Sequence, residues 1–204
     1  MPADSIHNSR LYSSPKEVLM VPIMALWLPI LVSAAIVFVA SSIVHMVFTY
    51  HDKDFKGVPE EDKLLNALRA FNLPPGEYVL PHAGSSKERN TPEFQEKMKK
   101  GTFIMSVWES GPPSMAKNLI QWFVYSVIVG IFAAYVVGRA LGPGAPYLAV
   151  FRFAGVTAFA CYTIAQWQDF IWFKRSWGRT FRGTIDGLVY GLLTAGTFGW
   201  LWPE

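Results

Sequence analysis

The sequence contains a single cysteine among its 204 residues, Cys161, and this residue lies inside an apolar stretch. One cysteine excludes an internal disulfide, a cysteine-rich zinc site and an iron–sulfur cluster held by this chain alone. Charged residues are also scarce, at 16%, whereas soluble domains carry about 25%. Together with a hydrophobic content of 51%, this deficit is typical of a membrane protein.

The sequence also lacks the short motifs of common catalytic and nucleotide-binding sites. It has no G-x-S-x-G, no G-x-x-x-x-G-K-[ST], no dinucleotide fingerprint, no C-x-x-C-H and no H-E-x-x-H. The polar segment 51–117 balances ten basic residues with ten acidic ones, so it forms no basic stripe that could follow phosphates. We therefore expect no enzymatic activity, no cofactor, no metal site and no nucleic-acid partner.

Long apolar stretches, in contrast, are abundant. A helix of about 20 apolar residues crosses a bilayer, and four stretches predict such helices: 21–50, 118–141, 147–173 and 184–202. We expect the third to leave the hydrocarbon near Ala165 and to continue as an interfacial segment through Trp177. Residues 1–20 form a polar amino-terminal segment. The predicted fold is an all-α helical membrane protein with four transmembrane helices and one polar insertion, 51–117.

The insertion 51–117 has the signals of a small mixed α/β unit. A helix begins near Pro59 and is stopped by the double proline 74–75, and a second helix follows the N-cap Thr91. The segments 76–81 and 102–108 have the composition of short strands. So small a unit has a marginal core, and we expect it to lean on the membrane face, on a second copy or on a partner.

Lysine and arginine predict the orientation of the helices in the membrane. With four spans, the two termini and the turn 142–146 share one side, which holds only Arg10, Lys16 and Arg139. The other side holds the ten basic residues of 51–117 and four more: Lys174, Arg175, Arg179 and Arg182. Because basic residues favour the cytoplasmic side, both termini are expected outside and the insertion in the cytoplasm.

Small residues recur at every fourth position in two of the predicted helices. The fourth helix carries Gly183, Gly187, Gly191, Ala195 and Gly199, and the second carries Gly130, Ala134, Gly138 and Gly142. Such ladders let helix backbones approach closely in a bilayer. Two interpretations follow. The ladders hold the helices of one molecule together, or one ladder, that of the fourth helix, is a docking face for another subunit.

Ionisable residues within predicted spans are candidates for function, because burying a charge in lipid is costly. They are His45, Arg152, Asp169 and Asp186. Asp169 and Asp186 are expected in an interfacial ion-pair cluster with the nearby arginines, and Arg152 is expected to reach the headgroups. His45 is interpreted as a packed histidine, with a proton relay toward Asp169 or Asp186 as the alternative.

The motif HDKD follows directly after the first predicted helix. His51, Asp52 and Asp54, with His82 as a fourth group, could supply metal ligands, but their spacing matches no known site. We interpret them as a solvated polar collar. A haem held by two histidines would need a partner for His45 at membrane depth, and the other histidines lie outside the predicted spans.

The stretch from Tyr50 to about Tyr162, including HDKDFKGVPEED, ALRAFNLPPGEYVLP, SGPPSMAKNLIQWFVY and AAYVVGRALGPGAPYLAVFRFAG, resembles a family of small bacterial multi-pass membrane proteins of unknown activity. The resemblance covers about half of the chain. It implies the bacterial inner membrane and brings with it no catalytic residue or cofactor.

These patterns favour a non-enzymatic integral membrane protein, an accessory or scaffolding subunit of a larger membrane complex. Its expected partners are the lipid bilayer and either other membrane subunits or further copies of itself. The alternative is a small transporter or a proton- or ion-conducting protein that uses the four intramembrane ionisable residues.

Overall fold

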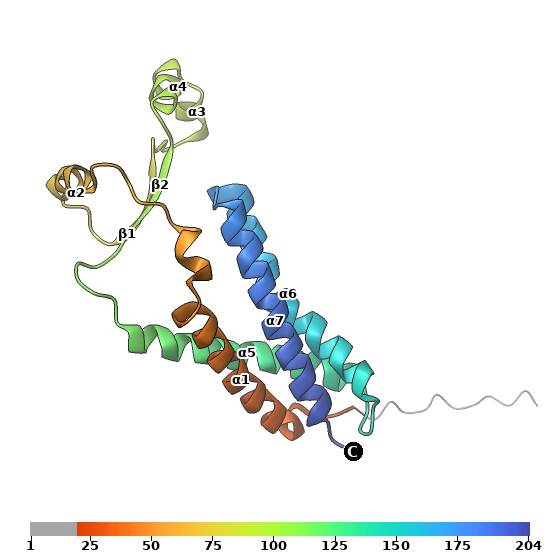
Figure 1. Ribbon diagram of the computed structural model, residues 1–204. Helices are drawn as coiled ribbons and strands as arrows, with labels where there is room; N and C mark the ends of the chain where they lie inside the picture. Colours follow the sequence, from red (N-terminus) through yellow and green to blue (C-terminus); the bar gives the residue numbers. More distant parts are fainter. Residues whose placement is uncertain (1–19) are drawn as a thin grey trace, which may run out of the picture.

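The computed structural model of the protein describes residues 20–204, so the segment 1–19, with Arg10 and Lys16, lies outside the described residues. The described chain is mostly helical (Figure 1). A 3-10 turn, η1 (Ile23–Leu26), leads into α1 (Trp27–Met46), and three further long helices follow: α5 (Met115–Ala140), α6 (Tyr147–Phe173) and α7 (Trp177–Trp200). The predicted helical fold class is thereby confirmed.

Three of the helical segments are long and apolar enough to cross a membrane. They are Ile23–Met46, Met115–Ala140 and Tyr147–Phe173. The predicted fourth span, 184–202, falls within α7, which is of similar length but contains more glycine, threonine and charge. The described residues therefore hold three candidate spans, as expected of a membrane protein.

The helix boundaries differ from the prediction near polar residues. The first helix ends at Met46 instead of residue 50, and a second 3-10 turn, η2 (Thr49–Asp54), follows it. The third helix has no interfacial continuation through Trp177. It ends at Phe173, because Lys174 adopts a left-handed conformation with φ of 54°. The Ser176 side chain then caps a new helix by accepting a hydrogen bond from the Arg179 amide (3.2 Å), so α7 begins seven residues before the predicted start.

The four long helices pack into one bundle. α6 and α7 form an antiparallel hairpin, and α1 lies against both α5 and α7. The centre of the bundle combines large and small apolar side chains, including Leu26, Val137, Val150 and Phe198. A side-chain hydrogen bond also ties α1 to α5, since the Trp122 indole donates to the Ser41 hydroxyl (2.6 Å).

The glycine ladder of α7 lies against α6 along its whole length. A Cβ atom on Gly191 would lie 3.1–3.2 Å from the Cβ, Cα and backbone nitrogen of Phe159. Gly187 packs in the same way on Thr163, and Gly199 on the ring of Tyr147. The further members meet α6 as well: Gly183 at Gln166 and Ala195 at Gly155. The ladder that we considered as a docking face for another subunit is thus covered by the same chain.

The ladder of α5 faces the first helical segment. A Cβ on Gly130 would lie 3.2 Å from Ile30, and one on Gly138 would lie 2.5 Å from the carbonyl oxygen of Val21. Ala134 is fully buried in the same cluster. Gly142 is not a member, because α5 ends at Ala140.

Two backbone hydrogen bonds gather distant parts of the chain at one end of the bundle. The Val21 amide donates to the Gly138 carbonyl (2.9 Å), and the Gly144 amide donates to the Pro203 carbonyl (2.9 Å). The start of the first helix, the turn 142–146 and the carboxyl terminus therefore lie at the same end, as a four-helix topology requires. Figure 1 shows the carboxyl terminus there.

The insertion extends from the opposite end of the bundle as a small α/β unit. It contains α2 (Glu61–Ala70), β1 (Gly76–Leu80), α3 (Ser86–Arg89), α4 (Pro92–Lys99) and β2 (Phe103–Val107). The two strands pair antiparallel, with Tyr78 opposite Met105. A small mixed unit with two helices and two short strands was predicted here, and α2, the sheet and the α3–α4 pair stand apart from the bundle (Figure 1).

Candidate functional site

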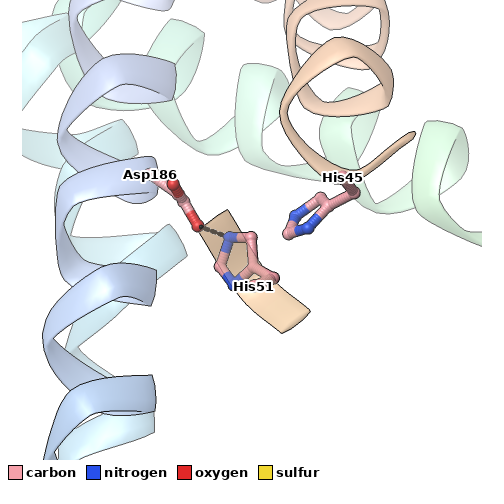
Figure 2. Close-up of side chains that lie close together, drawn as sticks. All are labelled: His45, His51 and Asp186. Carbon is pink, nitrogen blue, oxygen red and sulfur yellow. Dashed lines mark hydrogen bonds and ion pairs between the residues drawn. The ribbon is translucent and has the colours of Figure 1, made fainter. Parts of the chain in front are cut away.

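A cluster of polar side chains lies at the end of the bundle where α1 stops and α7 begins. It combines His45 from the last turn of α1 and His51 from η2 with Asp186 from α7 (Figure 2). η2 brings His51 to this place because it follows α1 and lies in contact with both α1 and α7. Three separate elements therefore position the cluster.

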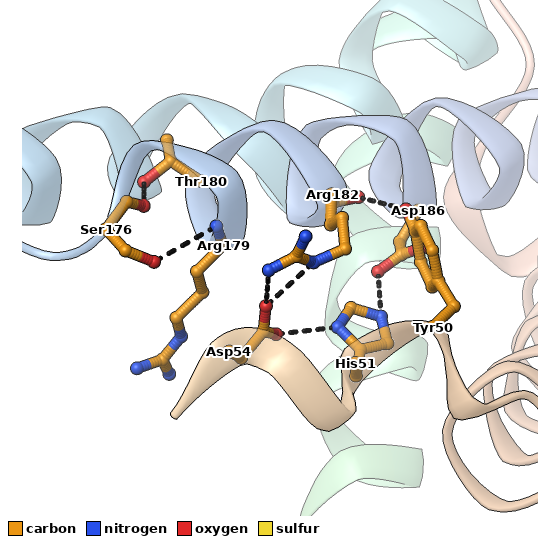
Figure 3. A network of polar contacts seen from close by, with 8 residues as sticks. All are labelled: Tyr50, His51, Asp54, Ser176, Arg179, Thr180, Arg182 and Asp186. Atoms are coloured by element: carbon orange, nitrogen blue, oxygen red, sulfur yellow. Dashed lines mark hydrogen bonds and ion pairs between the residues drawn. The ribbon is translucent and has the colours of Figure 1, made fainter. Parts of the chain in front are cut away.

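His51 lies at the centre of the cluster and contacts two carboxylates. Its Nδ1 is 2.7 Å from Asp54 Oδ2, and its Nε2 is 2.9 Å from Asp186 Oδ2 (Figure 3). Each ring nitrogen of His51 therefore has a carboxylate oxygen as its hydrogen-bond partner.

Arg182 contacts the second oxygen of the Asp54 carboxylate. Its guanidinium donates from Nε to Asp54 Oδ1 at 2.7 Å and also pairs with this oxygen through Nη2. Only 9% of the Asp54 side chain and 20% of the Arg182 side chain are exposed. Two carboxylates, one imidazole and one guanidinium thus form one partly buried polar network.

Residues of η2 have shifted pKa values for identifiable reasons. Burial raises the pKa of Asp54, but hydrogen bonds from His51 and Arg182 outweigh it, so the pKa of this carboxyl lies below its usual value. The pKa of the Tyr50 phenol is raised, first by burial and then by the charge of Asp186. Tyr50 donates to the Arg182 carbonyl oxygen (3.2 Å), which fixes η2 on α7 at a second point.

The His45 ring lies beside His51 without adding to this ion-pair network. The two ring centroids are 4.4 Å apart, and His45 is the exposed member of the cluster. His45 is therefore neither buried among the helices nor directed at Asp169. Its neighbours are His51 and Asp186.

A cavity of about 500 Å³ opens beside the cluster. Besides the cluster itself, its walls include Trp122, Tyr125, Cys161, Tyr162, Gln166 and Tyr190. The walls are held in place by hydrogen bonds, such as the one that the Tyr125 hydroxyl donates to the Cys161 carbonyl (2.7 Å). Charged, aromatic and amide groups therefore line one open cavity at the end of the bundle.

Tyr190 has an orphaned hydroxyl within this space. The residue is 3% exposed, and among the described residues its hydroxyl is the buried side-chain polar atom that has no hydrogen-bond partner. Buried hydroxyls are normally paired, and an unpaired one calls for an explanation. Tyr190 follows Asp186 by one turn of α7, so both side chains belong to the face that lines the cavity.

The other ionisable candidates lie away from the cluster. Asp169 is exposed on α6, and no ion pair joins it to an arginine within residues 20–204. Arg152 is exposed near the opposite end of α6. The predicted cluster of Asp169 and Asp186 with arginines is therefore wrong in its membership: Asp186 meets His51, and Arg182 meets Asp54.

The polar collar predicted for HDKD is also only partly correct. Asp52 and His82 are exposed, but His51 and Asp54 turn inward onto α7. The roles of Asp54, Arg182 and Tyr190 were not predicted. The closeness of HDKD to the end of the first helix was the available signal, since a short turn there places polar side chains at the bundle end.

Comparison with protein families, with curated proteins and with solved structures gives no match to this chain, so the functional conclusions rest on this geometry.

Proposed function

We propose that the chain is a non-enzymatic accessory or scaffolding subunit of a larger membrane assembly. One observation carries the proposal: the α/β unit has almost no core. Of residues 55–114, Phe94 is the one buried side chain. A lone two-stranded hairpin is marginally stable in water, so a unit of this kind gains stability from a surface that covers it.

The unit also exposes large apolar side chains that a covering surface would bury. Phe71 after α2 is 70% exposed, Phe103 of β2 is 62% exposed and Trp108 is 73% exposed. Large exposed apolar side chains on a unit with so small a core are candidates for contact with other proteins or with the membrane. The helices of the same chain leave them open, and a cavity of about 650 Å³ separates Phe103 from the connection between α6 and α7.

A photo-crosslinking residue in place of Phe103, tested in native membranes, is expected to give a discrete protein adduct. The matched control is the same residue in place of Val156, which is 70% exposed on the outer face of α6 and is expected to give no protein adduct. An adduct at twice the mass of the chain identifies a second copy, and any other mass identifies a different subunit. If the residue at position 103 photolyses efficiently and the chain still forms no protein adduct, the proposal is contradicted.

The proposed topology has four spans, with α7 as the fourth. At 1.5 Å per residue its 24 residues reach about 36 Å, enough for a hydrocarbon core of about 30 Å. Its charged residues all lie in the first ten positions, so 187–200 is uncharged. α7 follows α6 from Gly183 to Gly199, and a helix packed along a span over this length shares its position in the bilayer.

Reporter fusions are expected to place Gly57 and Glu204 on opposite sides of the membrane. The side that holds the insertion and the α6–α7 connection has more lysine and arginine residues than the other side. This distribution favours the cytoplasm for Gly57 and the outside for Glu204. In a bacterial host, alkaline phosphatase should be active after Glu204 and inactive after Gly57, and green fluorescent protein should show the reverse. Localisation of both sites on the same side would correspond to three spans and would refute the topology.

The resemblance to small bacterial membrane proteins supports the inner membrane as the location.

A small transporter or proton-conducting protein is the second candidate function, and the convergence of His45, His51 and Asp186 beside a cavity favours it. The remainder of α7 does not continue a polar path. Its buried threonines donate to carbonyls of their own helix, as Thr194 does to Tyr190 (2.9 Å). The polar groups are therefore gathered at one end of the bundle, which supports the accessory role better than conduction.

A further inference from the structure

We propose that His45, His51 and Asp186 bind one divalent transition-metal ion at the end of the helix bundle. The inference is independent of the proposed accessory role, because these residues belong to the bundle and to η2 rather than to the α/β unit. It departs from the expectation drawn from the sequence, in which no metal-ligand spacing is visible. The three ligands come from residues 45, 51 and 186, so only the fold brings them together (Figure 2).

The ligand atoms already lie close to the arrangement that an ion requires. One nitrogen from each histidine and one carboxylate oxygen lie within 4.8 Å of one another. Metal–nitrogen and metal–oxygen distances of about 2.0–2.2 Å in zinc sites place neighbouring ligand atoms about 3.3 Å apart in a tetrahedron. Side-chain movements of about 1 Å close the difference, and the His51–Asp186 contact at 2.9 Å needs only to open slightly.

The surroundings of His51 orient it as metal-binding histidines are oriented. Its Nδ1 is held by Asp54 at 2.7 Å, while Nε2 faces the ligand oxygen of Asp186 at 2.9 Å. Histidine ligands commonly donate their second ring N–H to a carboxylate, which fixes the ring and makes it a better ligand. Arg182 in turn holds Asp54, so this carboxylate orients the ligand and does not compete for the ion.

The orphaned hydroxyl of Tyr190 is an independent sign of a missing group. It lines the same cavity as the three ligands and has no hydrogen-bond partner. An ion with three protein ligands keeps a position for water, and a water bound there supplies a partner for a hydroxyl in the cavity. On binding, the ion replaces the proton between His51 Nε2 and Asp186, and this proton passes to water.

The ligand set narrows the choice of metal. Two imidazoles and one carboxylate suit zinc and the neighbouring first-row divalent ions, whereas magnesium and calcium prefer oxygen ligands alone. Cobalt(II) is therefore the informative probe, because its visible absorption reports nitrogen and oxygen ligands, and zinc(II) is the competitor.

The test uses the full chain, purified in mild detergent through a tag without histidine and treated with a chelator. Titration with cobalt(II) is expected to give one ion per chain with visible absorption that zinc(II) abolishes. His45→Ala and Asp186→Asn are expected to lose this binding. The matched controls His82→Ala and Asp169→Asn, at exposed positions outside the cluster, are expected to bind like the unaltered chain.

Two further variants make the result decisive. Asp54→Asn is expected to keep the stoichiometry and to weaken the affinity about 10–100-fold, as the loss of a ligand-orienting group does. His45→Ala leaves the ion pairs of His51 and Arg182 in place, so its melting curve should match that of the unaltered chain. The proposal fails if the unaltered chain binds no stoichiometric cobalt(II), or if folded His45→Ala binds it as before.

Discussion

Arg182→Leu is expected to lower the free energy of unfolding by about 3 kcal/mol. The substitution leaves Asp54 without its guanidinium partner at a site where 9% of the carboxylate side chain is exposed. Breaking a buried pair by removing one partner costs about 3–5 kcal/mol, and the remaining contact with His51 places the expected loss at the low end. Denaturation with increasing dodecyl sulfate in mixed micelles, followed by circular dichroism, measures the change.

The matched control for this substitution is Arg175→Leu, which removes the same charge from an exposed position in the α6–α7 connection. Its expected effect is within about 0.5 kcal/mol. The double variant with Asp54→Asn should lose less than the sum of the two single losses, since both break one network. Equal effects of Arg182→Leu and Arg175→Leu would mean that η2 does not depend on this network for its position on α7.

Gly191→Leu is expected to destabilise the chain itself by about 3 kcal/mol, at the upper end of the usual cost of overpacking. The added side chain meets Cα and backbone nitrogen of Phe159 at 3.2 Å, and backbone atoms cannot move aside without shifting α6. The α6–α7 hairpin should therefore open, and denaturation with dodecyl sulfate should occur at a lower detergent fraction than for the unaltered chain.

Gly196→Leu provides the control on the same helix. A Cβ there meets only the Tyr147 hydroxyl, at 3.7 Å, and replacing glycine in a helix gains about 0.8–1 kcal/mol of propensity. This variant should be as stable as the unaltered chain or more so. If Gly191→Leu instead left the stability of the chain unchanged and broke only a larger complex, α7 would be packing on a neighbouring subunit through its ladder.

Much of the fold could be predicted from the sequence because apolar length and turn residues act locally. The turn 142–146 and the span 147–173 agree with the observed helix bounds, and the two strands of the insertion lie where their composition placed them. The start of α7 could not be placed, since a serine cap and a left-handed lysine decide it. Neither residue type is restricted to such positions.

The candidate site was harder to predict for a different reason. His45 and Asp186 were singled out together as ionisable residues of the predicted spans, whereas His51 was assigned to the polar collar after the first helix. Their convergence depends on the contact of η2 with α7, which joins residues 135 positions apart and has no periodic signature. Periodicity predicts which face of a helix is apolar, but it does not predict which distant turn returns to that face.

The position of η2 in the chain has a consequence for biosynthesis. Asp54 leaves the ribosome 128 residues before its partner Arg182, which at about 5–20 residues per second takes about 6–26 s. For that time Asp54 and His51, beside the first helix, remain without their partners on α7. The junction between η2 and α7 therefore closes only after α7 has emerged, well after α1 and η2.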